Sequence, residues 1–331
     1  MVGGSTNRRD MANKTCVTSV PAQPDWHQQT VTYPLQPASV RKAVVPAAGL
    51  GTRHFPASHA VKKELFPVVG PDGIARALIH YQLIALLDAG IEEICIIVQP
   101  GDDVVMRAYL AGPDDAYLRK LEQHPALHAE AIRMREIARH VRFLVQHEQQ
   151  GYGHAVFQSK DFVGDDMVLL CLGDHLFRGH PVSPYAQLAA MAARSAGRSV
   201  SAVNRIGPEE LKGYGTISGV RDSANSCLID VHKIVEKPSL AIARDQLRVE
   251  GLGDDEFLGW FGMHLLAPSI YDILAGMIRD NIRDNGEFQL TRAQDLQRER
   301  DGYLALEMTG SERFDFGVPD DFVRSVAAFR T

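Results

Sequence analysis

The first convincing strand of this chain runs directly into a glycine turn, and this junction constrains the fold more than any other feature. Ala43 to Ala48 has the composition of a buried β-strand, and Gly49 and Gly51 follow it closely. Glycine lacks the Cβ atom that would keep a backbone amide away from an anion, so the turn predicts a phosphate cradle at a sheet edge. Two cations come next, Arg53 and Lys63, and they can neutralise a polyphosphate.

Three better-known patterns do not fit this junction. A P-loop requires G-x-x-x-x-G-K-[ST], and neither GKS nor GKT occurs in the chain. A dinucleotide-binding fingerprint would need a third glycine where His54 stands. The triplet Asp315-Phe316-Gly317 looks like a kinase metal motif, but no HRD precedes it and no APE follows it.

Composition sets the class of protein. The 331 residues are 45% hydrophobic and 23% charged, which is ordinary for one large α/β unit or two smaller ones, and we favour the single unit. The net charge of -6 argues against nonspecific nucleic-acid binding, so local cations must meet an anionic substrate. No run of about 18 apolar residues occurs, so no membrane span is expected. The four cysteines form no C-x-x-C pair, which is consistent with a reducing cytoplasm.

The pattern that follows the turn predicts a parallel sheet. Ile74 to Asp88 has helical spacing, and Ile91 to Val98 reads as a buried strand, so the segment is a β-α-β unit with a right-handed crossover. Two charged helical patterns then occupy residues 102–140, before a strand at Val141 to Gln146.

A later apolar strand, Asp166 to Cys171, ends just before Asp174. Polar groups at the carboxyl ends of parallel strands line the crevice where open α/β sheets bind ligands, so Asp174 is well placed. From about residue 199 onward, strands alternate with more irregular connections and helices, with strands at 199–203, 215–220, 231–236, 256–266 and 303–308 and helices at 268–279, 287–300 and 319–329.

The chain is rich in histidine, and two pairs resemble metal sites at first sight. His54 with His59, and His175 with His180, lack the helical i, i+4 spacing with a nearby acid that a metal motif shows. We therefore expect these side chains to face solvent or to form hydrogen bonds.

The glycine turn also resembles a known signature. Gly49 to Arg53 matches G-x-G-T-R, and Lys63 to Pro67 matches the K-E-x-x-P that follows it in sugar-nucleotide pyrophosphorylases. The segment resembles most closely the bacterial UTP-glucose-1-phosphate uridylyltransferases. The resemblance implies a Rossmann-like α/β fold with a mixed, mainly parallel sheet flanked by helices. It also implies that the triphosphate is bound by Ala48, Gly49, Gly51 and Thr52.

Further landmarks follow in the family's order. Gln146 stands five residues before Gly151, as the glutamine of the base-reading segment stands before G-L-G-H-A, so the resemblance makes these two the nucleobase candidates. A side-chain amide and a close glycine backbone can pair with the edge of uracil. Asp174 and Asp315 match two separate metal-binding aspartates, and Mg²⁺ is satisfied by few carboxylates when phosphate oxygens and water complete its shell.

The sugar side resembles the family as well. Glu236-Lys237-Pro238 matches E-K-P, whose glutamate meets sugar hydroxyls and whose lysine meets the sugar phosphate. Gly215 lies in a segment that looks like the family's Y-G-V-I. Pro238 favours an extended backbone at Lys237, which suits a side chain that projects from a strand end.

The resemblance implies attack by a sugar 1-phosphate on the α-phosphorus of UTP, with Arg53, Lys63 and Lys237 as the catalytic cations. The chain also departs from the family, since Lys62 replaces a usual proline and Val318-Pro319 replaces the N-K of the late D-C-G-N-K. Two alternatives therefore stay open: a relative that uses another sugar 1-phosphate or dTTP, and a catalytically idle homologue that binds a nucleotide sugar as a regulatory partner.

Residues 1–40 are rich in Ser, Thr, Asn, Gln and Pro and lack an apolar signal-peptide core, which predicts a disordered extension. Residues 41–331 are then one nucleotidyltransferase domain, with a nucleotide-binding part to about 198 and a sugar-binding part beyond it. A cytoplasmic location is expected, and the cysteine pattern is consistent with it. A homo-oligomer and a role in polysaccharide synthesis are expected from the resemblance alone.

Overall fold

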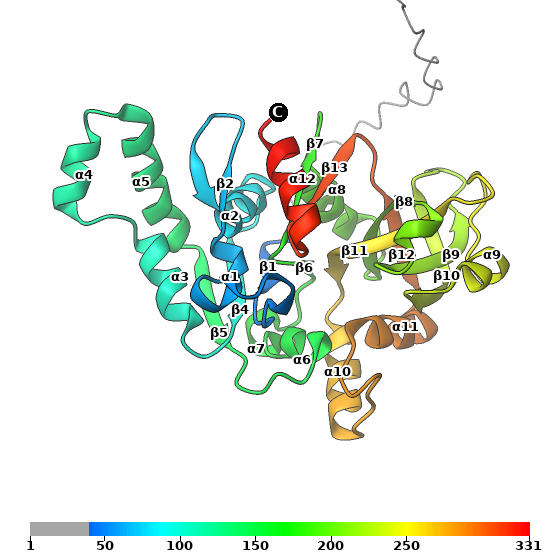
Figure 1. Ribbon diagram of the computed structural model, residues 1–331. Coiled ribbons are helices and arrows are strands. Elements are labelled where there is room, and N and C mark those ends of the chain that lie inside the picture. Colours follow the sequence, from blue (N-terminus) through cyan, green and yellow to red (C-terminus); the bar gives the residue numbers. More distant parts are fainter. Residues whose placement is uncertain (1–39) are drawn as a thin grey trace, which may run out of the picture. The chain divides into compact units, whose positions relative to one another are not determined.

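A nine-stranded mixed sheet organises the described residues, 40–331, of the computed structural model (Figure 1). Four strands at one side pair in parallel, in the spatial order β5 (Val141–Val145), β4 (Glu93–Val98), β1 (Lys42–Pro46) and β6 (Val168–Cys171). Helix α2 (Leu78–Asp88) connects the segment after β1 to β4. The predicted β-α-β unit with its parallel sheet is therefore confirmed. The extension predicted for residues 1–40 lies outside the described residues, apart from Val40.

The second half of the chain continues the same sheet with mainly antiparallel pairings. Strand β11 (Phe257–Leu266) joins the halves, because it pairs antiparallel with both β6 and β8 (Ser199–Ile206). The sheet then continues through β12 (Tyr303–Glu307), β10 (Leu228–Glu236) and β9 (Gly215–Arg221). A short helix within the irregular connections, α9 (Leu240–Gln246), was not predicted.

Two small sheets, which the sequence pattern did not predict, flank the main sheet. Strand β2 (Pro67–Val69) pairs with β3 (Ala75–Ala77), so helix α2 begins at Leu78 rather than at Ile74. Strand β7 (His175–Gly179) pairs with β13 (Ser311–Asp315). Helix α12 (Pro319–Phe329) packs beside β13 and β2 (Figure 1). The β7–β13 pairing sets Asp315 directly opposite His175, which brings distant parts of the chain together.

The helical insertion contains three helices rather than the two predicted patterns: α3 (Asp102–Ala111), α4 (Asp115–Leu121) and α5 (Pro125–Ala138). The Asp114 side chain caps α4 by accepting from the Tyr117 amide, and Pro125 stands at the first position of α5, where its missing N–H loses no helical hydrogen bond. Helices α4 and α5 lie side by side at the outer end of the insertion (Figure 1). Arg76 of β3 contacts Glu130 of α5 at 2.5 and 2.7 Å, which fastens the insertion to the β2–β3 hairpin.

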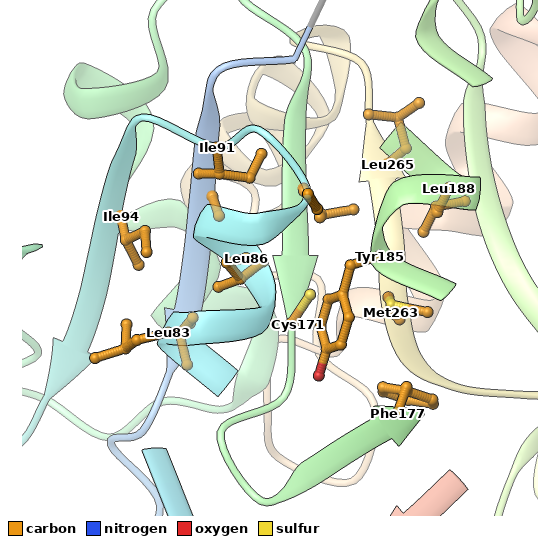
Figure 2. Close-up of a cluster of buried hydrophobic side chains, with 14 of the residues drawn as sticks. Leu83, Leu86, Ile91, Ile94, Cys171, Phe177, Tyr185, Leu188, Met263 and Leu265 are labelled. Atoms are coloured by element: carbon orange, nitrogen blue, oxygen red, sulfur yellow. The ribbon is translucent and has the colours of Figure 1, made fainter. Parts of the chain in front are cut away.

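The core lies on both faces of the sheet because side chains alternate along each strand. Val45 packs on the face covered by α2 and α8 (Pro184–Ala189), and Val44 on the face covered by α6 (Tyr152–Phe157) and α10 (Ser269–Arg279). Figure 2 shows the first face, where Leu86 of α2 and Tyr185 of α8 point toward Cys171. Truncating a buried leucine such as Leu86 to alanine would cost about 2–5 kcal/mol.

The remaining helices are α1 (Ala57–Ala60), α7 (Lys160–Val163) and α11 (Leu290–Asp301). Helix α11 begins three residues later than the pattern predicted, since Gln289 before it is still extended. Within residues 40–331, no helix is both long and apolar enough to cross a membrane.

Candidate active site

A cavity of about 590 Å³ lies beside the carboxyl ends of β1 and β6 and takes its walls from both halves of the chain. Most of the site residues that the sequence predicted line it: Ala48, Gly49, Thr52, Arg53, Lys63, Gln146, Gly151, Asp174, Gly215, Glu236 and Asp315. Gly51 and Lys237 are not among the lining residues. The structure therefore gathers residues that lie up to 267 positions apart, such as Ala48 and Asp315, around one space.

The glycine turn is held in place by side chains around it. Gly51 has a φ of 66°, which favours glycine, and its carbonyl accepts from the Ser58 hydroxyl at 2.8 Å. The Gly49 carbonyl accepts from Lys62 at 3.1 Å and from Gln99 at 2.9 Å. The loop is thus fixed through its carbonyl groups. Arg53 lies exposed beside it, and within residues 40–331 its guanidinium forms no ion pair.

A charged cluster forms the centre of the cavity. The ammonium group of Lys63 lies 2.5 Å from Oδ2 of Asp174, whose Oδ1 lies 3.0 Å from Nδ1 of His175. The other ring nitrogen of His175 lies 3.3 Å from Oδ2 of Asp315. His175 therefore bridges the two aspartates that the resemblance proposes as metal ligands.

The charge states in this cluster follow from burial and from these neighbours. Burial alone would raise the pKa of Asp174, but His175 and Lys63 outweigh it and hold that pKa well below its usual value. Burial alone would raise the pKa of Asp315, but His175, the Gly317 amide and Arg313 together lower it. Burial opposes protonation of His175, yet the two carboxylates raise its pKa to about 9. Both aspartates are consequently ionised at neutral pH.

Burial and nearby charges also shift the pKa values of the neighbouring residues Lys63 and Glu64. Burial alone would lower the pKa of Lys63, but the Asp174 and Glu64 carboxylates together keep it above its ordinary value. Glu64 is almost completely buried, which raises its pKa to about 7 even though Lys63 lowers it. A bound polyphosphate would therefore meet a lysine that stays protonated.

Asp174 and Asp315 fit a magnesium ion. A Cβ atom on Gly317 would lie 2.8 Å from an Asp174 oxygen and 3.1 Å from an Asp315 oxygen, so the two carboxylates approach the same point beside a glycine. The described residues contain no group of three or more His, Cys, Asp or Glu side chains arranged to hold a metal. Two carboxylates suffice for Mg²⁺ when substrate phosphates and water supply the other ligands.

The predicted nucleobase residues lie at another wall. Gln146 follows β5 and is buried, with its Nε2 3.0 Å from Nδ1 of His154. Gly151 has a φ of 110°, and a Cβ atom there would lie 2.7 Å from the Cβ of Glu287. The Gly153 amide also donates to the Phe288 carbonyl at 2.8 Å. This close approach requires glycine and ties the base segment to the segment before α11.

The predicted sugar residues surround the far end of the cavity. A Cβ atom on Gly215 would lie 2.1 Å from the indole nitrogen of Trp260, so only glycine fits there. Glu236 ends β10, and its Oε2 accepts from the Thr291 hydroxyl at 3.0 Å. Its carboxylate is therefore fixed at the cavity wall.

Lys237 is placed differently from the expectation. Its φ is 46°, in the left-handed region, and the extended backbone predicted from Pro238 is wrong. The Lys237 amide donates to the Tyr214 carbonyl at 3.2 Å, which turns the chain as it leaves β10. The Lys237 side chain is 51% exposed, and its Nζ lies 3.8 Å from the Glu236 carboxylate.

This arrangement can be compared with known proteins. The family model described as nucleotidyl transferase matches residues 42–329, nearly the whole described part of the chain. The chain belongs to the nucleotidyl transferase family. This nucleotidyl transferase is similar to UTP–glucose-1-phosphate uridylyltransferase 1 of Staphylococcus saprophyticus, with 28% identity over 290 residues, 88% of this chain and 92% of the relative. It is also 27% identical to the Mycoplasma pneumoniae uridylyltransferase over 288 residues, 86% of this chain and 91% of the relative.

Solved structures extend the comparison. The nucleotidyl transferase is similar to a UTP-bound UGPase from Acinetobacter baumannii, with a TM-score of 0.70 and 26% identity over 88% of this chain and 93% of the other. A UDP-glucose pyrophosphorylase complexed with UDP-glucose has a TM-score of 0.69 and 23% identity, covering 88% of this chain and 98% of the other, and shows the shared fold. The predicted Rossmann-like fold class is confirmed.

Sequence reasoning missed several residues that line the cavity of this nucleotidyl transferase, among them His175, Trp260, His264 and Gln294. His175 was expected to face solvent or form hydrogen bonds; it is buried and bonded, as is His54, whose Nε2 lies 2.9 Å from the Phe316 carbonyl. The position of His175 next to Asp174 was the available signal. The alternation of side chains along β11 did not indicate that Trp260 and His264 would line the cavity.

Proposed function

We propose that this nucleotidyl transferase forms UDP-glucose and pyrophosphate from UTP and glucose 1-phosphate. One observation carries the proposal: a single cavity joins the glycine turn and its cations to Gly215 and Glu236, with the Asp174–Asp315 pair between them in the charged cluster. The names of the similar uridylyltransferases support the choice of UTP and glucose 1-phosphate.

The reaction joins a phosphate oxygen of the sugar 1-phosphate to the α-phosphorus of UTP. The bond from that phosphorus to the bridging oxygen of the β-phosphate breaks, and pyrophosphate leaves with the electron pair. Since the nucleophile is already an anion, the reaction needs no strong general base. The main barrier that the protein must reduce is the repulsion between two anions held in line.

Cations in the cavity offset that repulsion. Two unit charges about 4 Å apart repel by about 4 kcal/mol at an effective dielectric constant near 20. In this proposal Arg53 contacts the leaving pyrophosphate and Lys63 the triphosphate, and Lys237 contacts the sugar phosphate. Lys63 is already held in the cavity by Asp174, whereas the exposed Lys237 has to turn toward the bound sugar phosphate.

The other residues select and orient the substrates. Ala48, Gly49, Gly51 and Thr52 form the turn that receives the triphosphate, and Gln146 and Gly151 pair with the uracil edge. Gly215 and Glu236 bind the sugar. Asp174 and Asp315 would hold one Mg²⁺, which when bound neutralises negative charge on the phosphates.

A panel assay tests this function. Pyrophosphate release is measured with UTP, dTTP, ATP, GTP and CTP, each combined with the 1-phosphates of glucose, galactose, mannose and N-acetylglucosamine. We expect the highest kcat/KM for UTP with glucose 1-phosphate. Preference for dTTP or for another sugar would establish the first alternative. UDP-glucose binding in calorimetry without turnover in Mg²⁺ would establish the idle homologue.

The cytoplasmic location and the homo-oligomer remain predictions from the sequence and the resemblance. Light scattering of the purified chain would test the oligomer.

A further inference from the structure

Strand β11 contains an irregularity at the sugar end of the cavity. Trp260 pairs with Val203 and His264 with Ser201, so four steps along β11 match only two along β8. Gly262, within this stretch, has a φ of 83°. Such irregularities redirect side chains and often occur next to active sites. Here the Trp260 and His264 rings meet edge to face, with centroids 5.7 Å apart, and both residues line the cavity.

The back of the His264 ring is held by a buried polar group of three side chains, Ser201, Gln294 and Tyr303. Its Nδ1 lies 2.7 Å from the Ser201 hydroxyl and 3.1 Å from Nε2 of Gln294. Both of those side chains also contact the Tyr303 hydroxyl at 3.0 Å. A ring held in this way has a fixed orientation, which is what a substrate-binding group requires.

The same contacts fix the proton on the ring. Because the Gln294 amide nitrogen is a donor, Nδ1 of His264 accepts, and the single proton of the neutral ring lies on Nε2. Burial lowers the pKa of His264 to about 3, so the ring is neutral at physiological pH. Among the described residues, no group forms a hydrogen bond with Nε2. An accessible N–H without a protein partner, on an otherwise buried residue that lines the cavity, is suited to a ligand oxygen.

We propose that His264 is a specificity-determining residue whose Nε2–H donates to one ring hydroxyl of the bound sugar 1-phosphate. The inference rests on the proposed function and deepens it. A carboxylate such as Glu236 can only accept from sugar hydroxyls, whereas His264 supplies a neutral donor at the same end of the cavity. A sugar that lacks the matching hydroxyl would leave this donor unpaired, so the enzyme should discriminate against it.

Two variants separate the roles of the two ring nitrogens. His264→Asn places an amide near the position of Nδ1, so it can keep the contacts to Ser201 and Gln294 while it withdraws the donor at Nε2. His264→Gln has a longer side chain and can place an amide N–H near the position of Nε2. Each variant and the wild type are assayed for kcat/KM with glucose 1-phosphate and with its 2-, 3-, 4- and 6-deoxy analogues.

For the wild type we expect one deoxy analogue to lose about tenfold or more in kcat/KM relative to glucose 1-phosphate. In His264→Asn that penalty should vanish for the same analogue alone, and His264→Gln should retain much of it. The KM for UTP should stay unchanged in both. His80→Asn is the matched control, because His80 is also buried with Nδ1 2.9 Å from a hydroxyl, that of Tyr109, but does not line the cavity.

The proposal is overturned if the wild type shows no deoxy penalty, or if His264→Asn lowers kcat/KM by the same factor for every sugar, as a structural role would. A wild type that turns over no sugar 1-phosphate would refute the proposed function instead. In that case calorimetry with UDP-glucose and its deoxy analogues still tests His264, by the same selective loss in His264→Asn.

Discussion

The ammonium group of Lys63 lies 2.5 Å from Oδ2 of Asp174, although 111 positions separate the two residues. Lys63 begins a short 3-10 turn after the glycine loop, and Asp174 follows strand β6 at the adjacent sheet edge. The pair joins the proposed triphosphate loop to a proposed metal ligand. Substrate or metal that enters the cavity must therefore share or replace this contact.

Removing Lys63 should destabilise the free protein. In Lys63→Met the buried Asp174 carboxylate retains His175 but loses its closer cation, and we expect a loss of about 1–3 kcal/mol in the free energy of unfolding. Urea denaturation without ligands measures it. Lys160→Met is the control, since Lys160 forms a more exposed pair with Asp272 at 3.4 Å and should change stability by less than about 1 kcal/mol. Equal stability of the two variants would contradict the importance of the Lys63 contact.

Lys62, where the family usually has proline, should act through its side chain. Its ammonium group lies 3.1 Å from the Gly49 carbonyl and 2.8 Å from Asp102, so it braces the glycine loop. We expect Lys62→Met to raise the KM for UTP about threefold to tenfold, the equivalent of one hydrogen bond, with a smaller effect on kcat.

Lys62→Pro separates the side chain from the backbone. Lys62 has a φ of -57°, and Val61 before it is extended, so proline fits without strain. We expect this variant to match Lys62→Met in the KM for UTP while its stability stays equal to that of Lys62→Met or exceeds it by about 0.4–1 kcal/mol. Unchanged KM values in both variants would show that the Lys62 contacts do not support the loop.

Lys237 should act on the sugar phosphate. We expect Lys237→Ala to raise the KM for glucose 1-phosphate and to lower kcat, with a loss of about tenfold or more in kcat/KM, because a charged hydrogen bond is removed. The KM for UTP should not change. Lys233→Ala is the control, since Lys233 is also exposed but lies within β10 and bonds to Gln246. Wild-type kinetics in Lys237→Ala would refute its assignment.

Metal removal should stop turnover. We expect EDTA to abolish pyrophosphate release and added Mg²⁺ to restore it. Asp315→Asn should raise the Mg²⁺ concentration for half-maximal activity about tenfold or more, because one of two carboxylate ligands is lost. Asp272→Asn, at an exposed carboxylate of α10 outside the cavity, should leave it unchanged. Full activity in EDTA would exclude a metal requirement.

The free energy of unfolding should decrease in mild acid, because the buried His264 resists protonation in the folded protein. Burial lowers the pKa of His264 to about 3, below the ordinary value of about 6.5 in the unfolded chain. Between pH 3 and pH 6.5 the unfolded state therefore binds one more proton than the folded state. The stability contributed by the neutral His264 is complete above pH 6.5 and is lost as the pH falls toward 3. Each such proton contributes about 1.4 kcal/mol per pH unit.

A substitution at His264 tests whether this residue causes the decrease in the free energy of unfolding at low pH. Urea unfolding of the wild type and of His264→Asn is compared between pH 6.5 and pH 4. We expect the variant to show a shallower decline, by close to one proton. His80, whose pKa burial lowers to about 4, keeps its own contribution in both proteins. Parallel slopes would mean that His264 is accessible to protons in the folded state.

Local sequence patterns predicted the strands of the main sheet and the residue types of the site, but not the two small sheets. Local properties predict strand β1, the glycine turn after it and the β-α-β order. Side-chain alternation and the stereochemistry of glycine do not depend on distant residues. The order of Lys63, Gln146, Asp174 and Glu236 along the chain was likewise visible. The resemblance of these motifs to one family led to the nucleotidyl transferase family that the comparison then showed.

The contacts among these residues depend on the tertiary fold. The β7–β13 pairing places Asp315 opposite His175, and His175 in turn contacts Asp174. Residues four apart in a regular strand share one face but lie about 13 Å apart, so only the irregular stretch of β11 lets the Trp260 and His264 rings meet at the cavity. Pairing across such distances depends on the combined packing of the whole sheet, and no local pattern records which strand a segment will meet. The charge state of the aspartates and the direction of the His264 donor follow from that packing.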